Sequence, residues 1–371
     1  MLAFLPQLDG LRGIAIILVL LHHLTIYRPS SGVDQWIASV PLVGWSGVDL
    51  FFVLSGFLIT GILLDARDSP RYFSSFYARR TLRIFPLYYL TVFVALVIVP
   101  TLPELHRVIV GPYQDPPHLP YWLYLTNFSL AGRGFVHGWI DVAWSLAIEE
   151  QFYIVWAVVV WLCLPRYLGW ICAAIILLSP VGRMLALDRG ADTTAVYVLT
   201  WFRLDGLATG ALLAWLMRRD LFASLGRYAP WMAGAGIASL IAITIDAGDS
   251  WWWHRRMQII GYSMTTLTGA SMLIAAINMP ANSWWPRLLS MGWLRAFGKY
   301  SYSLYLFHLP VMRLVREYAF DPADFPSLAI TPWLGQVLFY IAATAPAFAL
   351  SWLSWKAFEA PILRLKEKFP Y

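Results

Sequence analysis

Charged residues and cysteines are scarce in this chain of 371 residues. Asp, Glu, Lys and Arg make up 13% of it, against about a quarter in an average soluble domain, and hydrophobic residues make up 59%. This composition excludes a soluble enzyme and a disordered chain. The two cysteines, Cys163 and Cys172, fall in or beside apolar stretches, so we expect small core side chains rather than a disulfide.

Apolar stretches long enough to cross a bilayer recur along the whole chain. A transmembrane helix needs about 20 consecutive apolar residues. The ten predicted spans cover residues 8–27, 44–64, 84–100, 139–163, 167–186, 196–217, 229–246, 257–277, 299–318 and 333–355. The sequence therefore predicts an all-α, polytopic integral membrane protein with about ten transmembrane helices around a polar catalytic cavity.

Lys and Arg are more frequent in the connections on the amino-terminal side of the predicted membrane than in the alternate connections. Because cytoplasmic loops are enriched in basic residues, both termini are predicted to be cytoplasmic. The net charge of +6 then lies at lipid headgroups, so the bilayer is an expected partner and nucleic acid is not.

The longest connection, residues 101–138, is rich in Pro, Tyr and Trp and contains an apolar piece too short to span. We expect an outer loop with a re-entrant or interfacial helix. Residues 356–371 are expected to form a cytoplasmic tail. No linker to a soluble module is evident, which favours a single membrane-embedded domain over residues 1–371.

Ionisable residues in the first two spans indicate a functional site, because a charge inside a bilayer costs several kcal/mol unless it faces a cavity or a partner. Arg12 and His23 lie on one face of a helix, about 16 Å apart along its axis. His22 points about 80° away and is expected to pack or to bond a backbone carbonyl. Asp49 enters the second span near the depth of His23. It would orient His23 as a general base, or serve as a helix N-cap or first-turn acid.

Arg79, Arg80 and Arg83 precede the third predicted span, and Tyr88 follows them. Guanidinium groups at the start of a helix suit phosphate groups. Anchoring at the cytoplasmic face explains the three arginines equally well.

Two adjacent acids, Glu149 and Glu150, lie within the fourth span and require a polar cavity. Neighbours on a helix diverge by about 100°, so one is expected to face the cavity and the other to pair with an arginine such as Arg203. Arg203 and Asp205 could also form an ion pair with each other.

His308, before a proline, is interpreted as a packing or hydrogen-bonding residue. The candidate substrate-binding residues are Trp144, Ser145, Glu150, Tyr153, Arg203 and His308.

Several motifs follow one another in a fixed order along nearly the whole chain. They are Arg12 and His23 in an R-x10-H spacing, FFVLSGFLI at 51–59, R-x-x-R at Arg80 and Arg83, Trp144-Ser145-Leu146 with Glu149 to Tyr153, Ser301 to Tyr305 with His308, and Phe358-Glu359-Ala360-Pro361. This ordered set resembles the acyltransferase-3 family of integral membrane acyltransferases. No metal-ligand spacing or nucleotide-binding glycine motif occurs, so no metal is expected.

The resemblance implies transfer of an acyl group, usually acetyl from acetyl-coenzyme A, to a hydroxyl of a bacterial surface glycan or a related acceptor. It implies that Arg12 and His23 are the essential pair and that Arg80 and Arg83 serve the donor. Many relatives add a periplasmic esterase-like domain, whereas this chain ends soon after the tenth span. We therefore expect a stand-alone member of a bacterial inner membrane.

The residues fit that chemistry in their own right. Acyl-coenzyme A would meet Arg79, Arg80 and Arg83 from the cytoplasm, and His23 would deprotonate the acceptor hydroxyl. Arg12, Asp49 and Glu149 complete the catalytic candidates, and transfer through an acyl-histidine is left open. Outer-loop aromatic residues either stack on sugar rings or form an interfacial belt. A transporter of an anionic metabolite or lipid-linked sugar is the alternative, and it would release no free coenzyme A.

Overall fold

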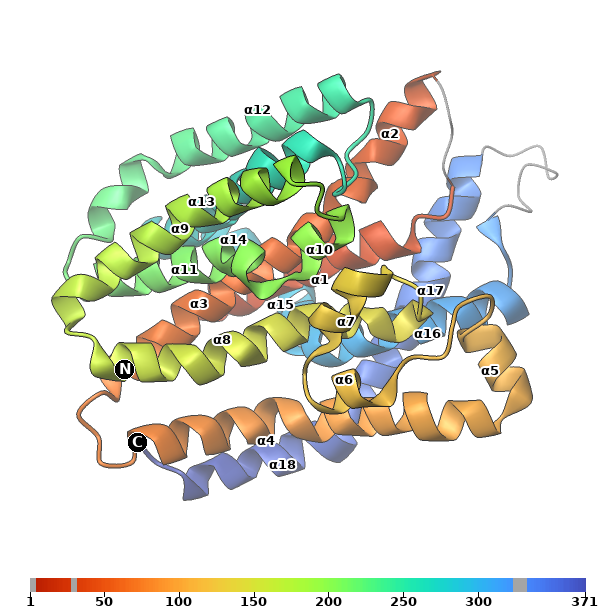
Figure 1. Ribbon diagram of the computed structural model, residues 1–371, viewed down its shortest axis with the longest axis horizontal. Coiled ribbons are helices and arrows are strands. Elements are labelled where there is room, and N and C mark those ends of the chain that lie inside the picture. Colours follow the sequence, from red (N-terminus) through yellow and green to blue (C-terminus); the bar gives the residue numbers. More distant parts are fainter. Residues whose placement is uncertain (1–4, 28–31, 323–331) are drawn as a thin grey trace.

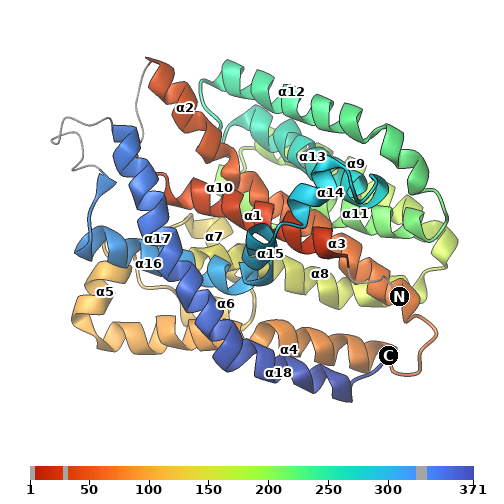
Figure 2. The same ribbon diagram turned by 180° about the vertical axis from the view of Figure 1, so that it is seen from behind.

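The computed structural model describes residues 5–27, 32–322 and 332–371. Within these ranges the chain forms helices and turns and contains no strand. The long helices are α1 Pro6–Leu24, α3 Gly47–Asp65, α4 Tyr72–Phe93, α8 Ala143–Leu162, α9 Pro165–Asp188, α11 Thr200–Met217, α12 Ala229–Ala247, α13 Tyr262–Asn278, α16 Ser301–Tyr318 and α17 Pro332–Ser354. Most of them run back and forth along one axis, and α17 crosses the bundle obliquely (Figure 1 and Figure 2).

Shorter segments connect the long helices. The short α-helices are α2 Gly32–Leu42, α5 Pro103–Ile109, α6 His118–Trp122, α7 Thr126–Arg133, α10 Thr193–Val198, α14 Trp284–Leu289, α15 Gly292–Lys299 and α18 Ala360–Arg364. The 3-10 or π segments that bear on the site are η1 Val43–Ser46, η4 Gly138–Val142, η6 Met257–Gly261, η8 Trp355–Glu359 and η9 Leu365–Lys368.

Eight helical segments of the described chain are long and apolar enough to cross a membrane. The other two predicted spans correspond to α11 and α16, which are helices of 18 residues each and carry ionisable residues. Both lie among the other long helices (Figure 1). The prediction of an all-α polytopic protein is confirmed. The amino-terminal end of α1 and the carboxyl terminus lie at the same end of the bundle, called here the terminal end (Figure 2).

One predicted boundary is wrong in a way that affects the site. Helix α4 begins at Tyr72 rather than near residue 84, so Arg79, Arg80 and Arg83 lie inside it and beyond its first turn. The helix dipole acts mainly within the first turn. The expected contribution of a helix start to phosphate binding is therefore removed, and these arginines can act only through their guanidinium groups.

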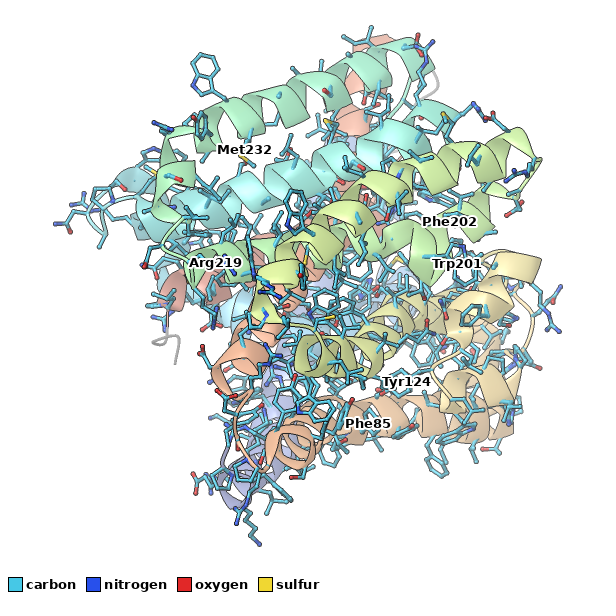
Figure 3. All side chains as sticks on the ribbon, turned by 60° about the vertical axis from the view of Figure 1, so that its left-hand side comes forward. Phe85, Tyr124, Trp201, Phe202, Arg219 and Met232 are labelled. Carbon is cyan, nitrogen blue, oxygen red and sulfur yellow. The ribbon has the colours of Figure 1, made fainter. Side chains whose placement is uncertain are left out.

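Helices α5, α6 and α7 occupy the long connection. Helix α6 packs against α4, whereas α5 packs against α16 and α7 packs against α8 and α10. Tyr124, in the turn between α6 and α7, has a φ of 54°. Its ring stacks on Tyr88 at a centroid distance of 4.1 Å and on Phe85 at 5.4 Å. Figure 3 shows Phe85 and Tyr124 on facing segments. These aromatic contacts, with Tyr124 itself buried, offset the strain of the left-handed turn and hold the connection on the bundle.

Helices α3 and α11 approach so closely that their backbones touch. A Cβ added at Gly56 would lie 1.9 Å from the Leu207 carbonyl oxygen, and one added at Gly210 would lie 2.0 Å from the Val53 carbonyl oxygen. Small residues allow this approach between membrane helices. The crossing brings the ionisable residues of the two helices within bonding distance of each other.

Replacing Gly210 by Ala is expected to lower the midpoint temperature of thermal unfolding in detergent, because the methyl group must push α3 away. Overpacking of this kind costs about 1–3 kcal/mol. Gly234 in α12 is the matched control, since a Cβ there meets nothing within 4 Å. Gly234→Ala should be neutral or slightly stabilising, because Ala favours a helix over Gly. Equal midpoints for Gly210→Ala and the wild type would contradict the close crossing.

Candidate active site

A cavity of about 110 Å³ lies in the half of the bundle nearer the terminal end. Helices α1, α3, α4, α8 and α16 enclose it. We call it the arginine cavity, and its lining residues are Arg12, Val48, Phe51, Phe52, Ser55, Arg80, Arg83, Ile84, Ser145, Leu146, Glu149, Tyr153, Ser301, Tyr302 and Tyr305.

The arginines of this cavity contact rings more than carboxylates. Arg80 lies over the Tyr153 ring at 5.6 Å, and Arg83 lies over the Trp355 ring at 5.4 Å. Arg12 is 3.7 Å from Asp9.

Glu149 faces the same cavity, which answers the question of which acid of the pair does so. Its carboxylate accepts hydrogen bonds from the hydroxyls of Ser55, at 2.7 Å, and Tyr153, at 3.0 Å. The arginine side chains thus keep donors available for an anionic ligand.

A second cavity, of about 450 Å³, lies toward the opposite end of the bundle. This volume is in the range of sites for small organic ligands. We call it the tryptophan cavity, and its lining residues are Val19, His22, His23, Trp45, Val48, Tyr113, Phe135, Gly138, Trp139, Asp141, Val142, Trp144, Tyr197, Trp251, Trp252, Trp253, Tyr305, Leu309, Met312 and Arg313.

His23 is held by a second histidine rather than by an acid. His308 Nδ1 donates to the Leu304 carbonyl at 3.1 Å, so its Nε2 is left as an acceptor. His23 Nδ1 lies 3.0 Å from this Nε2 and therefore donates to it. The network assigns His23 the tautomer whose Nε2 carries the free lone pair, which is the form that a general base requires.

His22 differs from His23 as the helical geometry predicts. Its Nδ1 lies 2.7 Å from the Leu42 carbonyl, and its ring packs edge-on against Trp251. The expectation that His22 packs or bonds a backbone carbonyl is confirmed.

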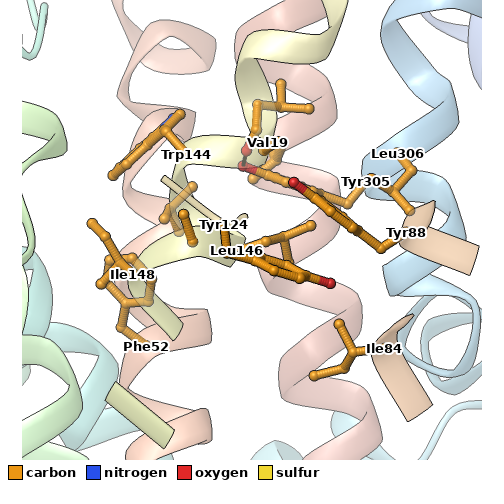
Figure 4. Packing of buried hydrophobic residues seen from close by; sticks show 14 of the residues in the cluster. Val19, Phe52, Ile84, Tyr88, Tyr124, Trp144, Leu146, Ile148, Tyr305 and Leu306 are labelled. Atoms are coloured by element: carbon orange, nitrogen blue, oxygen red, sulfur yellow. Dashed lines mark hydrogen bonds between the residues drawn. The ribbon is translucent and has the colours of Figure 1, made fainter. Parts of the chain in front are cut away.

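The two cavities share only a thin wall. Tyr305 and Val48 line both of them. The Tyr305 hydroxyl donates to the Val142 carbonyl at 3.0 Å and lies 2.7 Å from Ser145 Oγ. Figure 4 shows Tyr305 packed among buried side chains that include Val19 and Tyr88. Tyr305 and Val48 therefore lie between the arginine cavity and the tryptophan cavity.

Asp49 is not the partner of His23, and this expectation is wrong. Its carboxylate accepts from Arg203 Nη2 at 2.5 Å and from Thr265 Oγ1 at 2.6 Å. The Asp49 and Arg203 side chains are only 3% and 1% exposed, so each compensates the other's buried charge. Arg203 also lies over the Tyr262 ring at 4.1 Å.

Both expected pairings of Arg203 are therefore wrong. Arg203 bonds neither Glu149 nor Glu150, and Asp205 instead accepts from Arg183 at 2.9 Å and from Ser263. Because α3 and α11 cross so closely, an acid of α3 reaches Arg203 before any acid of α8 does.

Three other candidates lie outside the arginine cavity. Arg79 bonds the carbonyls of Lys366 and Phe369 in the carboxyl-terminal segment. Tyr88 donates to the Tyr121 carbonyl at 2.8 Å within the aromatic core. Glu150 is buried on another face of α8, and its Oε1 has no recorded hydrogen-bond partner among the described residues.

A larger apolar groove, of about 500 Å³, lies between α2, α12 and α13. Its lining includes Val40, Ile241, Thr265 and Met272, and none of its lining residues is ionisable. Ionisable residues line the two smaller cavities instead.

The comparison with known proteins identifies the class of this site. A family model described as an acyltransferase domain matches residues 5–355. The chain belongs to the acyltransferase-3 family. This match confirms the resemblance predicted from the ordered motifs. In the described part of the chain, no group of acids, histidines or cysteines could hold a metal ion.

Two relatives illustrate the match of this acyltransferase-3 protein. It is 30% identical over 333 residues to the O-acetyltransferase OatA of Staphylococcus aureus (strain NCTC 8325 / PS 47), covering 85% of this chain and 52% of the relative. It is 29% identical over 379 aligned positions to the peptidoglycan O-acetyltransferase OatA of Listeria monocytogenes, covering 97% of this chain and 56% of the relative. The chain spans about half the length of these curated relatives, and no solved structure gives a significant match.

Sequence reasoning gave no individual role to several residues of this acyltransferase-3 site. Tyr305 was visible only as part of a motif, although it lines both cavities. Trp251, Trp252 and Trp253 form a run in the connection before η6 and line the tryptophan cavity. Such a run was detectable in the sequence, but nothing there placed it beside His23.

Asp49→Asn is expected to lower the thermal stability of the protein strongly, because it leaves Arg203 buried beside a neutral partner. Breaking a buried ion pair costs about 3–5 kcal/mol. Asp65→Asn is the matched control: it breaks the other α3–α11 pair, with Arg218, whose side chains are 30% and 22% exposed. Exposed pairs contribute about 0–1 kcal/mol. Similar losses for the two variants, measured as midpoints of thermal unfolding, would refute the buried pairing.

Proposed function

We propose that this protein is a membrane O-acyltransferase that moves an acyl group, most simply acetyl, from acyl-coenzyme A to a hydroxyl of a cell-surface glycan. One observation carries the proposal. The two residues of the R-x10-H motif lie on the same helix, with Arg12 in the arginine cavity and His23 in the tryptophan cavity. Family membership and the names of the relatives support the same activity.

The arginine cavity is the proposed donor side. Coenzyme A carries several phosphate charges, and Arg12, Arg80 and Arg83 present planar, always-charged donors to such groups. Both termini are proposed to be cytoplasmic in a bacterial inner membrane, which makes the terminal end the side that meets the donor. The pantetheine arm would then carry the thioester inward, past Ser145, toward the wall at Tyr305.

The tryptophan cavity is the proposed acceptor side. Its aromatic faces suit the apolar faces of sugar rings, and its polar groups suit their hydroxyls. The Trp252 ring stacks on Tyr197 at 4.4 Å, and the Trp251 ring stacks on Trp253 at 4.2 Å. These paired rings form flat surfaces in the cavity that His23 also lines, where a glycan hydroxyl would be presented.

The chemistry needs one base between the two substrates. His23 Nε2 takes the proton of the acceptor hydroxyl, and the oxygen attacks the thioester carbonyl carbon. The new carbon–oxygen bond forms as the carbon–sulfur bond breaks, and the leaving thiolate receives the proton that His23 held. The products are an ester and free coenzyme A. His308 acts as a positioning residue, because it sets the tautomer of His23.

His23→Ala is expected to abolish release of free thiol from acetyl-coenzyme A, measured on the purified protein with a crude glycan extract. Loss of a general base reduces a rate by about 10²–10⁴-fold. His22→Ala is the matched control, because His22 bonds the Leu42 carbonyl and its loss should leave most of the activity.

Wild-type rates in His23→Ala would refute the proposed base. Tight binding of a glycan with transport into vesicles and no thiol release would favour the transporter instead.

His308→Ala should lower kcat by about tenfold or more with little change in the KM for the donor, because it frees the His23 ring without touching the donor cavity. His308→Gln should recover part of the activity, since its amide oxygen can accept from His23 Nδ1. Steady-state kinetics of the two variants provide the measurement. If His308→Gln is no better than His308→Ala, the positioning role is wrong.

A further inference from the structure

The carboxyl-terminal segment is tied to the arginine-bearing part of α4. Arg79 Nη1 donates to the carbonyls of Lys366, at 3.4 Å, and Phe369, at 3.2 Å. Ser75 Oγ donates to the Pro370 carbonyl at 2.5 Å, and Arg79 lies over the Tyr371 ring at 5.3 Å. Figure 1 and Figure 2 both show α18 alongside α4. The segment therefore follows α4 past its arginines.

This attachment places a further cation, Lys366, near the arginines of α4. Lys366 is half-buried and lies within electrostatic range of Arg83, Arg80, Arg79 and Arg12. No hydrogen bond or ion pair of its Nζ is recorded within the described ranges. Three of these arginines, Arg12, Arg80 and Arg83, line the cavity itself.

Asp9 pairs with Arg12 at 3.7 Å, but within the described ranges no ion pair joins the other nearby acids to Arg80, Arg83 or Lys366. The Glu149 carboxylate accepts hydrogen bonds from the hydroxyls of Ser55 and Tyr153. Glu359 Oε1 accepts one from Ser354 Oγ at 3.1 Å. Like charges held close together repel one another unless an anion joins them. The arrangement of cations thus has the features of a binding site for a ligand with several negative charges.

We infer that Lys366, together with Arg80 and Arg83, binds phosphate groups of a nucleotide thioester, with the segment 365–371 forming one wall of the donor entrance. This inference deepens the proposed function and rests on it for the identity of the donor. Arg79 has a different role from its two neighbours: it positions the segment through backbone carbonyls. Phosphate groups also occur on lipid headgroups, so the experiment must separate the two sources.

The test compares two donors that share the acetylated pantetheine arm, of which only acetyl-coenzyme A carries the phosphorylated nucleotide. Lys366→Gln, assayed on the full chain in maltoside detergent, should raise the KM for acetyl-coenzyme A about tenfold, the effect of losing one charge-assisted contact. Its kcat/KM for S-acetyl-pantetheine, which has no phosphate, should equal that of the wild type. Lys368→Gln is the matched control, because Lys368 is exposed on the same segment. It should behave like the wild type with both donors.

A double-mutant cycle tests the role of Arg79. Arg79→Gln should raise the KM for acetyl-coenzyme A selectively, and adding Lys366→Gln should then change little, because the segment that carries Lys366 is already displaced. Additive effects would overturn the positioning role.

An unchanged KM for acetyl-coenzyme A in Lys366→Gln would overturn the inference, as would equal losses with both donors. A defect seen only in phosphatidylglycerol vesicles would assign the phosphate to a lipid headgroup and also overturn it. Binding of adenosine 3′,5′-bisphosphate, measured by calorimetry, is independent of turnover. If Lys366→Gln weakens that binding while the wild type transfers no acyl group, the phosphate site stands and the proposed function fails.

Discussion

Lipid offers no hydrogen bonds, so every ionisable side chain inside the bundle must face a partner or a cavity. The contact between α3 and α11 meets this requirement first. Their backbones touch at Gly56 and Gly210, and the crossing pairs Asp49 with Arg203. With those charges compensated in the core, Arg12 and His23 face the two cavities.

In the proposed reaction, the arginine cavity receives the donor and the tryptophan cavity receives the acceptor. One is lined by three arginines, and the other is lined by aromatic rings and His23. The wall between them consists of side chains such as Tyr305 and Val48. In the proposed reaction, the two substrates approach from opposite ends of the bundle and meet where these side chains separate the cavities. Each substrate can then be recognised by its own chemistry, charge on one side and ring stacking on the other.

Sequence reasoning predicted the helices better than their contacts. Periodicity and length identified the long helices, and spacing on α1 separated His23 from His22 correctly. The partner of His23 was assigned to Asp49 because both lie at a similar depth, yet depth does not fix rotation about a helix axis. The start of α4 was placed too late because Arg79, Arg80 and Arg83 interrupt its hydropathy, although a helix tolerates arginines where their side chains reach a cavity or an interface.

The sequence by itself determined the helical class, the order of the spans and the shared face of Arg12 and His23, because these follow from composition and from the 3.6-residue period of one helix. Only the tertiary structure decided that His308 hydrogen-bonds His23 and that Arg203 forms an ion pair with Asp49. It also decided that Arg79 hydrogen-bonds the backbone of the segment that carries Lys366. Those pairings join residues far apart in the chain. They depend on how whole helices cross and rotate, and no local pattern encodes that geometry.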